Sequence, residues 1–163
     1  MWVRALTFVA ALTLSASAMA ADRVVDLSSV QGVAALLTEA GYKTEIKMGQ
    51  NDTSYIVSSV NGNPFNVNFY GCTNDKDCNS LDFYSWDKKE AFFSPAMANE
   101  WNTSHRFLKV AIDKDGDLSE FLSVSTLGNM TFANFKDYID WFSSTETDLA
   151  KFLEEKRGSK SSS

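Results

Sequence analysis

The sequence predicts an α+β fold in which an antiparallel β-sheet of about six strands is flanked by helices, in the order α-β-β-β-β-α-β-β-α. Two observations predict this class. The spacing of apolar residues changes along the chain from the helical period to the strand period of two, and later returns to the helical one. In addition, the connections between the predicted strands are short and rich in turn-forming residues, as antiparallel neighbours require.

Residues 1–20 have the three-part pattern of a cleavable secretory signal peptide. Arg4 precedes an apolar stretch from Ala5 to Leu14, and small residues then lead to Ala18-x-Ala20. The apolar stretch is too short to span a membrane, because spanning takes roughly 20 apolar residues. We therefore predict cleavage after Ala20, a periplasmic or secreted location, and no stable membrane insertion after cleavage.

The mature chain, residues 21–163, has a length that suits one domain. The signal peptide takes Arg4 and no acid with it, so the 15 Lys+Arg of the whole chain become 14 against 21 Asp+Glu, a net charge of −7. Nucleic acid and anionic membranes both need a cationic face, so this balance argues against either partner. We expect one domain over residues 21–155 and a flexible tail over 156–163.

The first predicted helix begins at Ser28, where Ser28-x-x-Gln31 matches a capping box, and stops at Gly41. One face of this helix is apolar, so it should pack on a sheet. Four predicted strands follow as an antiparallel meander over residues 42–48, 53–60, 65–70 and 81–86. Asn61-Gly62-Asn63-Pro64 provides the strongest turn between them, since Asn-Gly is a typical hairpin signal.

A second helix is predicted over residues 95–104, with Ser94 as the cap and Pro95 at its first position. A hairpin of two strands, 107–112 and 118–126, then turns through residues 113–117. The last helix begins at Thr131 and keeps one apolar face through Leu153, with the stretch 143–145 as a candidate interruption.

Cys72 and Cys78 are predicted to form a disulfide that closes the third turn of the meander. An even number of cysteines in an exported chain favours a disulfide. A redox pair usually has two residues between its cysteines, whereas five separate these two, and zinc needs four ligands. Closing this short polar loop should stabilise the fold by about 2–2.5 kcal/mol.

The run Asp113-x-Asp115-Gly116-Asp117 could hold calcium, but its spacing does not match an EF-hand. Counted from Asp113, glycine is fourth rather than sixth, and the twelfth residue is Val124 rather than a bidentate glutamate. A hairpin turn explains the same residues. A calcium or small-ligand sensor stays an alternative, and we predict no metal and no cofactor.

No catalytic constellation is visible in the sequence. His105 is the only histidine, and no nucleophile elbow accompanies it. Acidic neighbours such as Asp75 with Asp77, or Glu154 with Glu155, are interpreted as surface charge. The remaining enzymatic alternative is a hydrolase of the cell envelope whose site is assembled only by the fold.

Aromatic residues of the predicted strands are the candidates for a binding surface. Tyr84 and Trp86 alternate with Leu81 and Phe83, so they should lie on the face opposite the core. If Tyr70 joins them there, the outer face of the sheet becomes a candidate surface for a partner.

Several short motifs, taken in order, resemble the YbjN family. They are Asn99-Glu100-Trp101-Asn102, the strand pair that turns through Asp115-Gly116, and Phe132-x-x-Phe135 in the last helix. The resemblance covers about residues 30–153. It implies a fold similar to type III secretion chaperones, no reaction and no cofactor, and a family label of sensory transduction regulator.

The resemblance also implies protein binding and a possible homodimer. The signal peptide and the cysteine pair are departures from cytoplasmic members. Within the family motif, Asn99, Trp101 and Asn102 are interpreted as structural residues that attach the second helix to the sheet and its neighbouring backbone. We expect a non-enzymatic exported module that binds an unknown protein or peptide.

Overall fold

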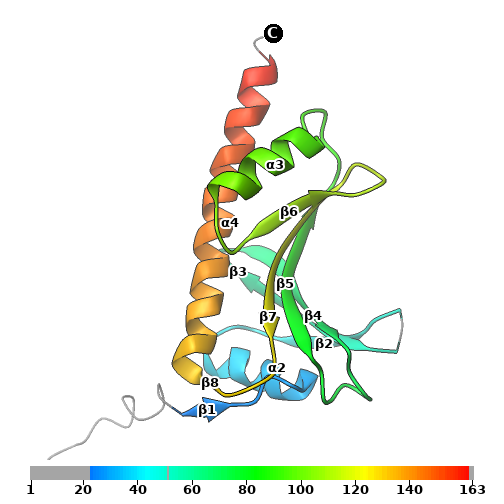
Figure 1. Ribbon diagram of the computed structural model, residues 1–163, viewed down its shortest axis with the longest axis vertical. Coiled ribbons are helices and arrows are strands. Elements are labelled where there is room, and N and C mark those ends of the chain that lie inside the picture. The colour runs from blue at the N-terminus through cyan, green and yellow to red at the C-terminus, as the bar shows by residue number, and fades with distance from the viewer. Residues whose placement is uncertain (1–22, 51, 162–163) are drawn as a thin grey trace, which may run out of the picture.

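The computed structural model describes residues 23–50 and 52–161. The predicted signal peptide and its cleavage site lie outside these residues. The elements run, in order, β1 (Val24–Val25), α2 (Val30–Glu39), β2 (Glu45–Met48), β3 (Ser54–Val60), β4 (Asn63–Tyr70), β5 (Ser80–Asp87), α3 (Pro95–Ser104), β6 (Lys109–Ile112), β7 (Leu118–Ser125), β8 (Met130–Thr131) and α4 (Phe132–Ser161) (Figure 1). The predicted α+β class is confirmed.

Six strands form one antiparallel sheet in the order β2-β3-β4-β5-β7-β6. The predicted meander is therefore correct, and the second hairpin adds β7 beside β5 and places β6 at the edge. The sequence did not predict the small second sheet, in which β1 pairs with β8. Its strands have two residues each, which is too short for a periodic pattern.

The core lies between one face of the sheet and the helices. Inward side chains of β4, β5 and β7 alternate with partly exposed ones. Phe142 of α4 is buried against this face, with its ring 5.2 Å from the ring of Phe65 and 5.6 Å from that of Phe83. In Figure 1, α4 runs along this side of the sheet. The other face of β4, β5 and β7 carries no described helix.

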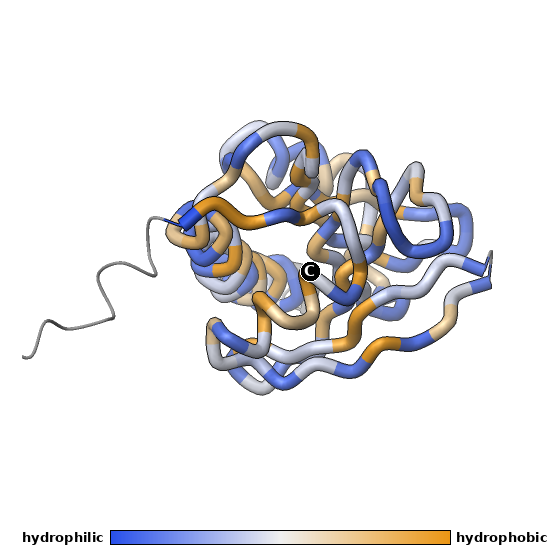
Figure 2. The backbone as a smooth tube through the Cα atoms, turned by 90° about the horizontal axis from the view of Figure 1, so that it is seen from below, coloured by the Kyte–Doolittle hydropathy of each residue, from blue (hydrophilic) through white to orange (hydrophobic). Residues whose placement is uncertain are grey.

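The last helix is amphipathic and continuous. Viewed from below, its turns carry both apolar and hydrophilic residues (Figure 2). The predicted interruption at 143–145 is wrong, because the helix runs unbroken from Phe132 to Ser161. The hydroxyl of Thr145 donates to the Trp141 carbonyl oxygen one turn earlier, so it is satisfied within the helix. Buried Phe142 and Leu149 also hold both sides of this stretch against the core.

The same helix continues through most of the segment 156–163, which the sequence suggested was a flexible tail. Lys156 forms an ion pair with Glu100 of α3, with N–O distances of 2.6 and 2.7 Å. Arg157 binds the Glu90 carboxylate through two nitrogens, at 3.0 and 2.5 Å. Glu90 and Arg157 are exposed to solvent, so these contacts add little energy but orient the end of the helix.

Two local predictions need correction. Ser29, not Ser28, caps α2, and its hydroxyl accepts a hydrogen bond from the Gly32 N–H at 3.2 Å. The hairpin turn between β3 and β4 contains only Asn61 and Gly62, with φ of 52° and 85°, while Pro64 belongs to β4. A two-residue loop needs positive φ at both positions, which Asn-Gly supplies.

None of the described helices is long and apolar enough to cross a bilayer.

Candidate functional site

The three aromatic residues predicted for the outer face do lie together there. Tyr84 of β5 is paired across the sheet with Asn66 of β4 and with Phe121 of β7. Directly opposed residues of neighbouring strands share a face. Trp86 follows two residues later on β5, and Tyr70 lies near the end of β4 on the same face. Tyr70 is 46% exposed and Trp86 is 48% exposed.

Two hollows in the surface lie along this face and adjoin each other. The larger one, about 820 Å³, extends from β2 to β5 and includes Tyr70. The smaller one, about 220 Å³, includes Trp86 and reaches the turn between β6 and β7. Asn66 and Tyr84 line both hollows, so the two hollows meet at these residues. We call this surface the outer face.

The outer face and its border carry several carboxylates, while Lys47 of β2 on the same face is ion-paired with Glu45. Asp82 of β5 lies opposite Asn68 on this face. Burial, and then the nearby Asp82, raise the pKa of Tyr70 to about 12. Asp113 and Asp117 line the hollow beside Trp86. On the same face, the Lys109 ammonium donates to the carbonyl oxygens of two α3-end residues at 3.0 and 2.7 Å, so this cation is already paired with protein groups.

A second candidate site is a buried pair of carboxyl groups between β7 and α4. Glu120 is 4% exposed. The Ser85 hydroxyl oxygen lies 2.6 Å from Oε2 of Glu120 and 2.8 Å from Oε1 of Glu146. A hydroxyl has only one proton to donate, so one of these two hydrogen bonds needs a protonated carboxyl as its donor.

The pKa values of the two carboxyl groups also indicate that one of them is protonated. Burial and the nearby Glu146 raise the pKa of Glu120 to about 9, and burial raises the pKa of Glu146 as well. The pair therefore keeps one proton at neutral pH, with Glu120 as its holder; Glu120 then donates to the Ser85 oxygen, and the Ser85 hydroxyl donates to Glu146. A cavity of about 300 Å³, which Asp87 also lines, opens onto this pair.

This pair was not predicted from the sequence, although β7 contains one residue that indicates it. Glu120 occupies an inward position between Leu118 and Leu122 in an alternating strand. A charged residue at a core position is rare unless it is paired. Its partner, Glu146, belongs to a distant helix, so only the fold could identify it.

The family motif attaches α3 to the edge of the sheet, as predicted for two of its three residues. Trp101 is fully buried, and its indole N–H donates to the Leu108 carbonyl oxygen at 3.1 Å. The Asn102 side chain binds both backbone groups of Val110, accepting from the N–H at 3.0 Å and donating to the carbonyl oxygen at 2.8 Å. Asn99 is exposed on the same helix.

His105 does not meet the carboxyl pair. Its ring stacks face to face on Trp101, with the centroids 3.6 Å apart, and Nδ1 lies 2.9 Å from the Ser104 hydroxyl oxygen. His105 is therefore the C-cap residue of α3, and its ring packs on the last turn of that helix. A hydrolase site that combines His105 with a buried carboxylate has no support in this geometry, because His105 does not line the cavity beside the carboxyl pair.

The acidic run after β6 forms a hairpin turn. One oxygen of the Asp113 carboxylate accepts from the backbone N–H groups of Asp115 and Asp117, both at 2.9 Å. Gly116 has φ of 87°, which favours glycine. Within residues 23–50 and 52–161, no group of three or more His, Cys, Asp or Glu side chains is arranged to hold a metal.

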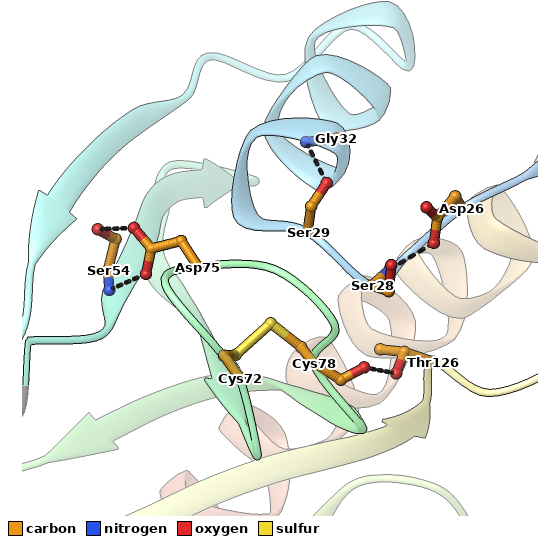
Figure 3. The surroundings of a disulfide bond; sticks show 9 residues. All are labelled: Asp26, Ser28, Ser29, Gly32, Ser54, Cys72, Asp75, Cys78 and Thr126. Carbon is orange, nitrogen blue, oxygen red and sulfur yellow. Dashed lines mark hydrogen bonds between the residues drawn. A yellow bond between two sulfur atoms is a disulfide. The ribbon is translucent and has the colours of Figure 1, made fainter.

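Cys72 and Cys78 form the predicted disulfide, and the loop that it closes connects three elements (Figure 3). The Asp75 carboxylate accepts from both the N–H and the hydroxyl of Ser54, at 2.8 and 2.6 Å, where β3 begins. The Asp75 carbonyl oxygen accepts from the N–H of Val30 at the start of α2, and the Thr126 hydroxyl donates to the Cys78 carbonyl oxygen.

These features define a small α+β domain whose sheet is covered by helices on one face and whose other face is aromatic, hollowed and acidic. The chain belongs to the YbjN family: the family model, described as "Putative bacterial sensory transduction regulator", matches residues 29–155. Comparison with curated proteins and with solved structures found no significant match.

Proposed function

We propose that this chain is an exported, non-enzymatic protein-binding module, and that its outer face binds an extended, basic segment of a partner protein. The observation that carries the proposal is the pair of adjoining hollows that are lined by Tyr70, Tyr84 and Trp86 on a sheet face without a described helix. Large exposed apolar groups gathered on one surface are typical of protein-interaction sites.

Aromatic side chains suit this task energetically. Tyrosine and tryptophan bury a large area with few rotatable bonds, and they are the residues most often found at the energetic centre of interfaces. Asn66 and Asn68 lie between the aromatic rings and offer both donors and acceptors to a backbone that is laid across the strands.

The charge of the face favours a basic segment. Asp113 and Asp117 line the smaller hollow and Asp82 lies on the same face, whereas the ammonium of Lys109 is bound to backbone carbonyls and that of Lys47 is paired with Glu45. Opposite charge steers association and penalises acidic competitors.

Export is supported by two independent features. The N-terminal residues 1–20 carry the pattern of a cleavable signal, and the disulfide between Cys72 and Cys78 is of the kind that forms and persists in oxidising compartments.

The proposal is tested with two dye-labelled extended peptides of equal length and equal apolar content, one rich in lysine and one rich in glutamate. Fluorescence anisotropy should show tighter binding of the lysine-rich peptide, weakening with added salt. Trp86→Ala should raise its Kd at least about tenfold. Leu127→Ala, which removes an exposed apolar side chain elsewhere, should not change it. Equal binding of both peptides, or binding unaffected by Trp86→Ala, would contradict the proposal.

The carboxyl pair supports a second candidate function, a hydrolase of peptide bonds. Two carboxyl groups that share a proton beside a cavity of about 300 Å³ are an arrangement that can activate water as base and acid. Its test is the cleavage of an unfolded protein substrate by the mature chain between pH 4 and pH 7, with Glu146→Gln as the comparison. Cleavage that persists in Glu146→Gln, or no cleavage by the unchanged chain, would exclude this function.

A further inference from the structure

The two edge strands of the six-stranded sheet, β6 and β2, differ in how far their outward backbone groups are covered. At the β6 edge, Asn102 of α3 binds the N–H and the carbonyl oxygen of Val110. A side chain therefore occupies positions that another strand would need. At the β2 edge, all four residues, Glu45–Met48, are exposed. An uncovered edge strand is a template for pairing with another chain.

The hydrogen bonding of β2 shows which backbone groups face the free edge. The N–H of Gly49 donates to the Thr53 carbonyl oxygen at 3.0 Å, so Gly49 faces β3. Direction alternates along an antiparallel strand, so Glu45 and Lys47 also face β3, whereas Ile46 and Met48 direct their N–H and carbonyl groups outward. Within residues 23–50 and 52–161, no strand lies beside β2 on this side, because β2 is the edge strand of the sheet.

We propose that a second copy of this chain pairs with β2 in antiparallel orientation, with the Ile46 residues of the two copies opposite each other on a twofold axis. In this register, each Ile46 exchanges two backbone hydrogen bonds with its counterpart. Thr44 of each copy likewise faces Met48 of the other, which uses the remaining outward groups.

The charged side chains of β2 favour this register over the neighbouring registers. With Ile46 on the axis, Glu45 of each copy lies opposite Lys47 of the other, so two pairs of opposite charge form on one face. If the axis passed through Glu45 or Lys47 instead, identical charges would face each other. Opposite charges directly across a strand pair stabilise it, and like charges destabilise it.

The same pairing covers apolar surface. Ile46 is 42% exposed and Met48 is 67% exposed in the single chain, although Ile46 pairs with buried Ile56 and lies on the core side of the sheet. Pairing would join the two six-stranded sheets into one. The larger hollow of the outer face, which Gly49 and Gln50 line, would then lie next to its equivalent in the second copy.

Sedimentation velocity of the mature chain over a wide range of concentrations tests this inference. The unchanged chain should show a concentration-dependent dimer, whereas Glu45→Lys and Lys47→Glu should each weaken self-association at least about tenfold, because each places like charges opposite one another. An equimolar mixture of these two variants should form a dimer again, since every cross-strand pair is then of opposite charge.

The mixture keeps the experiment decisive, because a variant that had merely lost its fold could not recover by mixing. Ile46→Pro provides a further check: Pro removes an outward N–H that β3 does not use, so the dimer should be lost while the circular dichroism spectrum is kept. A chain that stays monomeric at every concentration would overturn the inference. Single charge variants that dimerise as well as the unchanged chain would also overturn it.

Discussion

Replacing Glu120 by glutamine should stabilise this protein at neutral pH, and the gain should grow as the pH rises. Glu120 is buried between β7 and α4, and its pKa is raised from 4.5 to about 9 in the folded state. The folded chain therefore holds a proton that the unfolded chain has released. A carboxyl group with a raised folded-state pKa contributes stability below its unfolded pKa, and this contribution is lost as the pH rises toward the folded pKa.

The expected magnitude follows from the number of protons. One proton bound only in the folded state costs up to about 1.4 kcal/mol of unfolding free energy for each pH unit within this window. From pH 5 to pH 7 the unchanged chain should lose up to about 2.7 kcal/mol through this group. The amide of the Glu120→Gln variant does not titrate, and it can still donate to Glu146 or to the Ser85 hydroxyl.

Urea unfolding, followed by circular dichroism at pH 5, 6, 7 and 8, measures this difference. The free energies of the two proteins should lie close together at pH 5 and diverge in favour of Glu120→Gln above it. Glu155→Gln is the matched control, because Glu155 is exposed on α4. A difference between Glu120→Gln and the unchanged chain that is the same at pH 5 and pH 8 would refute the reasoning, as would a less stable variant at pH 7.

Three further predictions concern other parts of the chain. Replacing both Cys72 and Cys78 by serine should lower the free energy of unfolding by about 2–2.5 kcal/mol, measured by urea titration, and a reducing agent should then have no further effect. Asn102→Ala should cost about 1–3 kcal/mol, because the two backbone groups of Val110 lose their partner; thermal unfolding measures it, and an unchanged midpoint would contradict this role. Mass spectrometry of the exported chain should find an N-terminus directly after Ala20.

Most of the fold was predictable because each large element carries a local signal. Ser94 and Pro95 mark the start of α3, and the structure begins that helix at Pro95 as predicted. Asn61-Gly62 specified its hairpin for the same reason. Local signals were insufficient where tertiary contacts determine the structure. Phe142 and Leu149 hold α4 continuous through a serine- and threonine-rich stretch that has lower helical preference.

Of the two candidate sites, one was predictable from a local sequence pattern and the other was not. The outer face was predictable from the alternation of Tyr84 and Trp86 with buried neighbours on a single strand. The carboxyl pair was not, because Glu120 and Glu146 come from a strand and a helix whose packing no local pattern specifies. A polar residue at an inward strand position is the part of that signal that the sequence did contain.

Amide chemical shifts of the mature chain, followed by NMR during titration with the lysine-rich peptide, test the central proposal most directly. We expect the shifts to change at outer-face positions such as Asn66, Tyr84 and Phe121, while those around Glu146 on α4 stay unchanged. Changes centred on Glu146 and the cavity beside it, with the outer face unaffected, would contradict the proposal that the outer face binds the partner.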